Sequence, residues 1–161
     1  MYLYLVQHAD AKQKEEDPDR HLTASGKEVI QRVASFLAEN IDIQLHSIIH
    51  SGKTRAIETA KVLSGKLKPL KGIEEGKELG PNSTPWGWVE NLSQIENNIM
   101  LVGHLPHLQR LSSLLLCQDE HKKVIEFQNG GVLCLFKDES SIWTTKWLLI
   151  PQIIPQQPTT S

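Results

Sequence analysis

Short apolar runs alternate with amphipathic stretches along most of the chain. The run from Tyr2 to Gln7 predicts a short buried strand. Further strands are predicted over residues 47–50 and 99–103, with a weaker one near Ile73 and a late antiparallel pair over residues 131–137 and 142–149. Trp143 and Trp147 fall at even spacing on the last strand and are interpreted as core residues.

Between the strands, apolar residues recur with the period of amphipathic helices. Thr23 is suited to cap the first helix, because its hydroxyl can accept a backbone N–H of the first turn. The apolar face of that helix consists of Val29, Ile30, Val33, Phe36 and Leu37. Further helices are predicted over residues 54–67, 85–95 and 105–117, and residues 11–20 are predicted to form a loop.

Strands that alternate with helices predict an α/β protein in which a mostly parallel, mixed sheet lies between two helical layers. We expect one domain over residues 1–150. Residues 151–161 contain three prolines and no charged side chain, which favours an extended or disordered tail. Ligands of such sheets bind at the carboxyl ends of the strands, so the residues that follow the strands are the candidates for function.

Three predicted strands end on residues suited to phosphoryl transfer. His8 follows the first strand, Ser51 to Arg55 follow the strand 47–50, and His104 follows the strand 99–103. A neutral imidazole can attack phosphorus and form a phosphohistidine. The Arg55 guanidinium and the N–H groups of the first helical turn after Ser51 can bind phosphoryl oxygens, and a protonated His104 can donate to an oxygen or to the leaving group. This chemistry requires neither a metal nor a cofactor.

Composition narrows the remaining classes of function. The chain has 161 residues and a formal net charge of −2, so no basic field attracts nucleic acid or an anionic membrane. No apolar stretch approaches the roughly 18 residues of a membrane span, and no signal-peptide core is present, which favours a cytoplasmic location. Cys117 and Cys134 lie in apolar runs and are predicted to be buried reduced thiols, although a disulfide between them stays open.

Two other interpretations of the same residues are weaker. The segment from Ser51 to Thr54 resembles the end of a nucleotide-binding loop, G-x-x-x-x-G-K-[ST], but Ser47 stands where the first glycine is required. His104 and His107 are three residues apart, yet Pro106 lies between them and the other side chains show no metal-ligand spacing.

Four motifs, in order along the chain, resemble those of the histidine phosphatase superfamily, which is also called phosphoglycerate mutase-like. The closest likeness is to its short branch, the SixA-type phosphohistidine phosphatases, and it extends to about Leu149. The matching segments are Gln7-His8-Ala9-Asp10-Ala11, Arg20-His21-Leu22-Thr23-Ala24-Ser25-Gly26, Ser51-Gly52-Lys53-Thr54-Arg55-Ala56-Ile57-Glu58-Thr59 and Leu101-Val102-Gly103-His104-Leu105-Pro106.

The resemblance implies a phosphoglycerate mutase-like fold and a role for each matching residue. His8 resembles the phosphorylated nucleophile, Arg55 and His104 resemble residues of the phosphate pocket, and Ser51 and Arg20 are nearby contributors. The implied substrate is a phosphorylated protein, such as a histidine phosphotransfer or carrier protein, or a small phosphorylated molecule.

Gln7 departs from the pattern, because the family places an arginine there. Glutamine keeps hydrogen-bond donors but loses the charge, which Lys12, Arg20 or Lys53 could partly restore. Two interpretations stay open: a phosphatase of reduced activity, and an inactive pseudo-phosphatase that serves as a phosphate-binding or protein-interaction module.

Glu78 is the only obvious candidate for a general acid in the segment after the third strand. The short branch of the superfamily generally lacks a convincing proton donor. An imidazole can leave phosphorus as a neutral molecule, whereas an alkoxide cannot. We therefore expect a preference for P–N bonds or aryl phosphates over alkyl phosphate esters.

Overall fold

Four parallel strands form the centre and one edge of a mixed sheet in the computed structural model, which describes residues 1–156. The sheet order is β3-β2-β4-β1-β5-β6, and β5 and β6 run antiparallel to their neighbours. The strands are β1 (Tyr2–Gln7), β2 (Ser47–His50), β3 (Ile73–Glu75), β4 (Ile99–Gly103), β5 (Val132–Lys137) and β6 (Trp143–Leu149). Parallel pairing at the centre of the sheet confirms the predicted fold class.

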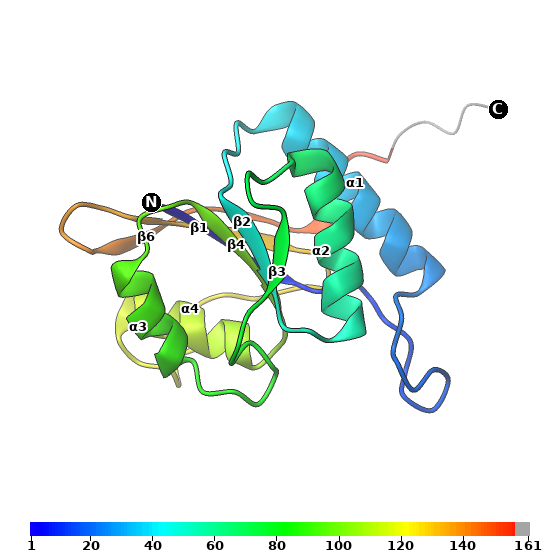
Figure 1. The fold of residues 1–161 in the computed structure, drawn as a ribbon, viewed down its shortest axis with the longest axis horizontal. Coiled ribbons are helices and arrows are strands. Elements are labelled where there is room, and N and C mark those ends of the chain that lie inside the picture. Colours follow the sequence, from blue (N-terminus) through cyan, green and yellow to red (C-terminus); the bar gives the residue numbers. More distant parts are fainter. Residues whose placement is uncertain (157–161) are drawn as a thin grey trace.

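Helices cover both faces of this sheet, as Figure 1 shows. Helices α1 (Ala24–Asn40) and α2 (Thr54–Leu67) lie on one face, and α3 (Trp86–Gln94) and α4 (His107–Cys117) lie on the other. Each helix has an apolar side that it buries against the strands, which is the arrangement of a three-layer α/β/α sandwich.

The alternation of side chains along β1 divides the core into two layers. Tyr4 and Val6 pack toward α1 and α2, whereas Leu3 and Leu5 pack toward α3 and α4. All four side chains are at most 3 % exposed. Burying one such side chain contributes roughly 1.5–3 kcal/mol, so β1 anchors both halves of the core.

Strand order explains why distant residues meet at one end of the sheet. Strand β4 lies between β1 and β2, and the register pairs Gln7 with Gly103 and His50 with Val102. The three parallel strands therefore end almost level with one another. The residues that follow them, His8, Ser51 and His104, leave the sheet at the same edge.

The ends of two helices differ slightly from the prediction. Helix α4 begins at His107 rather than at residue 105, with Pro106 as its N-cap residue. Pro85 likewise precedes α3 as the N-cap residue instead of opening the helix. In both places the proline marks the helix start to within two residues.

The predicted tail is wrong for its first residues. Pro151–Ile153 form a short 3₁₀ helix, η1, and Ile154 is only 6 % exposed. Ile154 belongs to the core layer beneath α1 and α2. Pro151 and Ile154 are buried, so the segment after the last strand packs back onto the domain, whereas Ile153 is exposed. The rest of the predicted tail, residues 157–161, lies outside the described residues.

The two late tryptophans are partly buried, but on opposite faces of the sheet. Trp147 packs with the core layer of α1 and α2, and Trp143 with that of α3 and α4. Cys134 pairs with Trp147 and Leu135 with Thr145, so β6 contains a bulge between these pairs. One extra residue in a strand reverses the side-chain alternation beyond it, which the even spacing of the sequence does not reveal.

The cysteines are both free thiols. Cys134 is buried as predicted, and burial raises the pKa of its thiol to about 12. Cys117 is only partly buried, because it is the last residue of α4. Within residues 1–156, no helix has the length and hydrophobicity needed to cross a bilayer.

Candidate active site

The His8 imidazole lies at the end of β1, against the first turn of α2. Its Nδ1 is 2.7 Å from the carbonyl oxygen of Ala9, and its Nε2 is 3.2 Å from Nε of Arg55. The carbonyl can only accept a hydrogen bond and the guanidinium can only donate one. His8 is therefore a neutral imidazole that carries its proton on Nδ1 and has its lone pair on Nε2.

His104 faces His8 from the end of β4. The two ring centroids are 4.9 Å apart, with an angle of 53° between the ring planes. Nε2 of His104 is 2.6 Å from the hydroxyl oxygen of Ser51, which follows β2. Nδ1 of His104 is buried and has no hydrogen-bond partner among residues 1–156. The predicted convergence of His8, Arg55, Ser51 and His104 is thus present in the geometry.

Burial keeps the histidines of this cluster neutral. Loss of solvent is the largest cause that lowers the pKa of His8 to about 4, and the nearby charges of Arg55 and Arg20 lower it further. Loss of solvent also lowers the pKa of His104 to about 3, with contributions from His8, Arg55 and Lys53. A neutral His104 in the ligand-free site differs from the protonated donor considered from the sequence.

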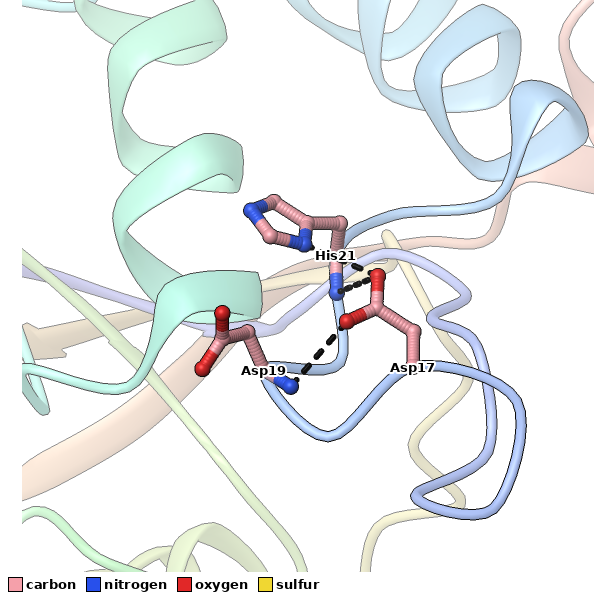
Figure 2. Close-up of side chains that lie close together, drawn as sticks. All are labelled: Asp17, Asp19 and His21. Atoms are coloured by element: carbon pink, nitrogen blue, oxygen red, sulfur yellow. Dashed lines mark hydrogen bonds and ion pairs between the residues drawn. The ribbon is translucent and has the colours of Figure 1, made fainter.

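Arg20 reaches the site on the loop between β1 and α1. The loop is fixed by Asp17, whose carboxylate accepts hydrogen bonds from the backbone N–H groups of Asp19 and His21 and from Nδ1 of His21 (Figure 2). Arg20 itself has a positive φ of 55°, and its Nε donates to the carbonyl oxygen of Lys12. Its charge contributes to the lowered pKa of both His8 and Arg55. Arg20 therefore adds positive potential to the site.

Asp17, Asp19 and His21 are also a group whose potential ligand atoms lie within 4.8 Å of one another. Their hydrogen bonds to one another account for this proximity. The cluster shapes the loop that carries Arg20.

Gln7 is partly buried at the end of β1, and its side-chain oxygen has no hydrogen-bond partner within the described part of the chain. Lys53 is an exposed residue of the loop between β2 and α2, and its charge contributes to the low pKa of His104. Lys12 lies 3.9 Å from the carboxylate of Asp17, which partly neutralises it. Arg20 and Lys53 are the compensating cations that this geometry supports.

Two groups considered from the sequence make other contacts in this structure. No hydrogen bond within residues 1–156 joins Glu78 to His8, Arg55, Ser51 or His104, and the Glu78 carboxylate lies against Gly87 in α3. The N–H of Gly52 donates to Nδ1 of His50 and is not free for an anion. The loop after β2 therefore offers fewer backbone donors than a nucleotide-binding loop requires.

Two residues at the site were not among the sequence candidates. Thr59 accepts a hydrogen bond from the N–H of Ala9, and Asn129 donates one to the carbonyl oxygen of His8. Thr59 has a sequence signal, because it closes the same motif as Ser51 and Arg55. Asn129 has none, since it lies in a loop 121 residues after the backbone carbonyl that it binds.

The comparisons with known proteins agree with this arrangement. Residues 3–80 match the histidine phosphatase superfamily (branch 1). This segment includes β1, the Arg20 loop, and the turn that carries Ser51 and Arg55. The N-terminal half of the chain is therefore similar to the histidine phosphatase superfamily. No curated protein gives a significant match to the sequence.

Solved structures of histidine phosphatases share the fold over nearly their whole length. The protein histidine phosphatase SixA, solved in complex with tungstate, is 21 % identical with a TM-score of 0.81, and the match covers 94 % of this chain and 98 % of that one. The alpha-ribazole phosphatase from Shigella flexneri is 16 % identical with a TM-score of 0.77, covering 94 % and 97 %. At these identities the likeness establishes the phosphoglycerate mutase-like fold.

Proposed function

We propose that this protein is a phosphatase that hydrolyses phosphohistidine, or a related P–N or phosphate ester bond, through a covalent phosphohistidine on His8. The observation that supports the proposal most strongly is the state of His8. Its Nδ1 is hydrogen-bonded to Ala9, and its Nε2 lone pair is held beside Arg55 and His104. The match of residues 3–80 to the histidine phosphatase superfamily supports the same reaction.

In the first step, the Nε2 lone pair of His8 forms a bond to phosphorus while the bond from phosphorus to the substrate nitrogen breaks. The leaving imidazole takes that electron pair and departs neutral when its other nitrogen carries a proton. In the second step, the oxygen of a water molecule bonds to phosphorus and the electrons of the N–P bond return to His8. The products are inorganic phosphate, the free substrate imidazole and the regenerated enzyme.

Arg55 has two positions in this scheme. Without a ligand, its Nε–H lies 3.2 Å from the lone pair of His8 that must attack. A nitrogen that accepts this hydrogen bond cannot bond to phosphorus at the same time. A phosphoryl group offers Arg55 stronger, charge-assisted and bidentate partners, so substrate binding draws the guanidinium away and frees His8.

His104 and Ser51 complete the set of donors. Their 2.6 Å contact fixes the His104 ring, whose centroid lies 4.9 Å from that of His8. An anion beside His104 favours the protonated form, so we expect its pKa to rise from about 3 when phosphate binds. The role of a charged donor thus belongs to the ligand-bound enzyme.

The substrate class follows from what the site lacks. No hydrogen bond within residues 1–156 joins Glu78 to the histidine pair, and we infer that the leaving group departs without a strong proton donor. A leaving imidazole tolerates this, whereas an alkoxide does not. The substrate we propose is therefore a phosphorylated protein, such as a histidine phosphotransfer or carrier protein, with a small phosphorylated molecule as the second option.

The test is release of inorganic phosphate from a phosphohistidine protein by the wild type and by His8→Ala. We expect release by the wild type and none by His8→Ala, with His121→Ala as a control on an exposed histidine. Equal release by the wild type and His8→Ala contradicts the proposed nucleophile. Equal turnover of an alkyl phosphate and of phosphohistidine contradicts the proposed substrate class.

Gln7 favours a second candidate, a pseudo-phosphatase that binds phosphate without transferring it. Replacing an arginine by glutamine removes one charge-assisted contact, worth roughly 1.5–3 kcal/mol, from the phosphate pocket. This candidate predicts that phosphate stabilises the protein against heat while the wild type releases none from phosphohistidine.

A further inference from the structure

The peptide group that joins His8 to Ala9 is held on both of its edges by side chains. Its carbonyl oxygen accepts from Nδ2 of Asn129 at 3.0 Å, and its N–H donates to Oγ1 of Thr59 at 3.0 Å. The N–H of His8 in addition donates to the carbonyl of Gly103 at 3.1 Å, which continues the pairing of β1 with β4. The turn after β1 is therefore fixed from three separate segments of the chain.

Thr59 connects this turn to the residue that faces the nucleophile. Its hydroxyl accepts from the N–H of Ala9 and donates its single proton to the carbonyl of Arg55 at 2.7 Å. Both hydrogen-bonding functions of Thr59 are thus used, and the side chain is completely buried. This one hydroxyl thus bridges the His8 turn and the first turn of α2.

Asn129 comes from the loop that precedes β5. The N–H of Gly130, the next residue, donates to the carbonyl of Gln7 at 2.9 Å. The Asn129 side chain and the Gly130 backbone together bind two successive carbonyl groups at the end of β1. This loop has no other evident reason to reach the site, since neither residue contacts Arg55, Ser51 or His104 through a hydrogen bond within residues 1–156.

The carbonyl of Ala9 belongs to the next peptide group along the chain, so the orientation of the His8–Ala9 peptide group affects where that carbonyl lies. That carbonyl accepts the Nδ1 proton of His8 at 2.7 Å, which leaves the lone pair on Nε2. If the His8–Ala9 peptide group rotates, the carbonyl of Ala9 moves and Nδ1 loses its acceptor, so of the two contacts that set the tautomer only the one from Arg55 remains. The wrong tautomer presents an N–H to phosphorus instead of a lone pair.

We propose that Thr59 and Asn129 are positioning residues that fix the tautomer of His8 by holding the two edges of the His8–Ala9 peptide group. Their catalytic consequence rests on the proposed role of His8 as the nucleophile. Their effect on the tautomer does not, because it follows from the ligand-free geometry alone.

The variants Thr59→Val and Asn129→Ala each remove one of the two contacts. Thr59→Ser keeps the hydroxyl and is the conservative rescue. Ser112→Ala and Asn98→Ala are matched controls, because Ser112 is a buried helical hydroxyl bonded to the carbonyl of Gln109 and Asn98 donates to the carbonyl of Gln44. Neither control contacts the His8 turn through a hydrogen bond.

The direct measurement is the pair of ¹⁵N chemical shifts of the His8 ring at neutral pH, assigned with His8→Gln. In the wild type, Thr59→Ser and both controls, we expect one protonated and one unprotonated nitrogen. In Thr59→Val and Asn129→Ala we expect the two shifts to move toward each other as the tautomers mix. Activity in these two variants should fall roughly 10–10²-fold in kcat with KM little changed.

The outcomes separate this inference from the proposed function. Unchanged ring shifts in both Thr59→Val and Asn129→Ala overturn the inference, whatever happens to the activity. Should Thr59→Val fail to fold, the shifts of Asn129→Ala decide alone. Averaged shifts in a protein that never transfers phosphate support the positioning role and reject the proposed function.

Discussion

At the scale of the residue, the site depends on the protonation states of a few buried groups. The contacts of His8 specify one neutral tautomer, because one partner can only accept and the other can only donate. His104 is neutral for a different reason, since burial and the charges around it oppose a proton. The two imidazoles therefore differ in their free nitrogen. In His8 the Nε2 lone pair accepts from Arg55, whereas in His104 Nε2 contacts Ser51 and Nδ1 has no hydrogen-bond partner among residues 1–156.

A single substitution at the end of β1 tests how much activity is lost because Gln7 replaces the arginine of the family pattern. We predict that Gln7→Arg raises kcat/KM for a phosphohistidine substrate by roughly 10–10²-fold, because it adds a charge-assisted contact worth roughly 1.5–3 kcal/mol. Steady-state kinetics measures the change. Gln7→Met is the control. It keeps the length of the glutamine side chain and adds no charge, so it should give no gain in kcat/KM. An equal or lower rate for Gln7→Arg would mean that Arg20 and Lys53 already supply the required charge.

At the scale of the element, the start of α1 packs closely against the backbone at Asp10, and this contact fixes the loop that carries Arg20. Thr23 caps α1 as predicted, accepting from the N–H of Gly26 at 2.9 Å. A Cβ added to Gly26 would lie 2.2 Å from the carbonyl oxygen of Asp10. Glycine is therefore required where α1 begins, because the backbone that follows His8 passes directly over it.

This contact predicts opposite effects of alanine at two helical glycines. Gly26→Ala should destabilise the protein by roughly 1–3 kcal/mol, because two backbone segments must move apart. Gly65→Ala, in an exposed position of α2 with no atom within 4 Å of the added Cβ, should stabilise it by up to about 1 kcal/mol. Urea unfolding of both variants gives the comparison. A destabilising Gly65→Ala together with a neutral Gly26→Ala would contradict the packing described here.

The elements also show what the sequence could and could not predict. Apolar periodicity was sufficient for α2, whose bounds match the prediction, and for the three strand ends that carry His8, Ser51 and His104. The bulge in β6 has no such signal, because it depends on pairing with β5. Asn129 has none either, since its role arises only when the chain folds back over the end of β1. The local pattern of apolar residues predicts helices and strands. Contacts between loops that are distant in sequence can be identified only once the fold is known.

At the scale of the whole molecule, three buried histidines make the stability depend on pH. The pKa values of His8, His104 and His107 are lowered to about 4, 3 and 4, and burial is the largest cause for each. In the unfolded chain these groups bind protons below their ordinary value of about 6.5. Between about pH 6.5 and pH 4 the unfolded state therefore binds more protons than the folded one, and stability falls as the pH falls.

We predict a lower free energy of unfolding at pH 4.5 than at pH 7, with about 2–3 kcal/mol from each histidine that stays neutral in the folded state. Urea unfolding at the two pH values measures the difference. His107→Gln should reduce this difference, and the exposed His121→Gln should leave it unchanged. A difference that His107→Gln does not alter would show that buried histidines are not its source.

The central claim is that the Nε2 lone pair of His8 attacks phosphorus, and trapping the phosphoenzyme tests it most directly. The protein is mixed with a phosphohistidine donor, quenched, and analysed by mass spectrometry for a phosphoryl group that is stable in base and lost in acid. We predict that the group is found on His8 in the wild type and is absent from His8→Ala. A wild type that binds phosphate yet carries no such group on His8, or carries it on another residue, would contradict the account.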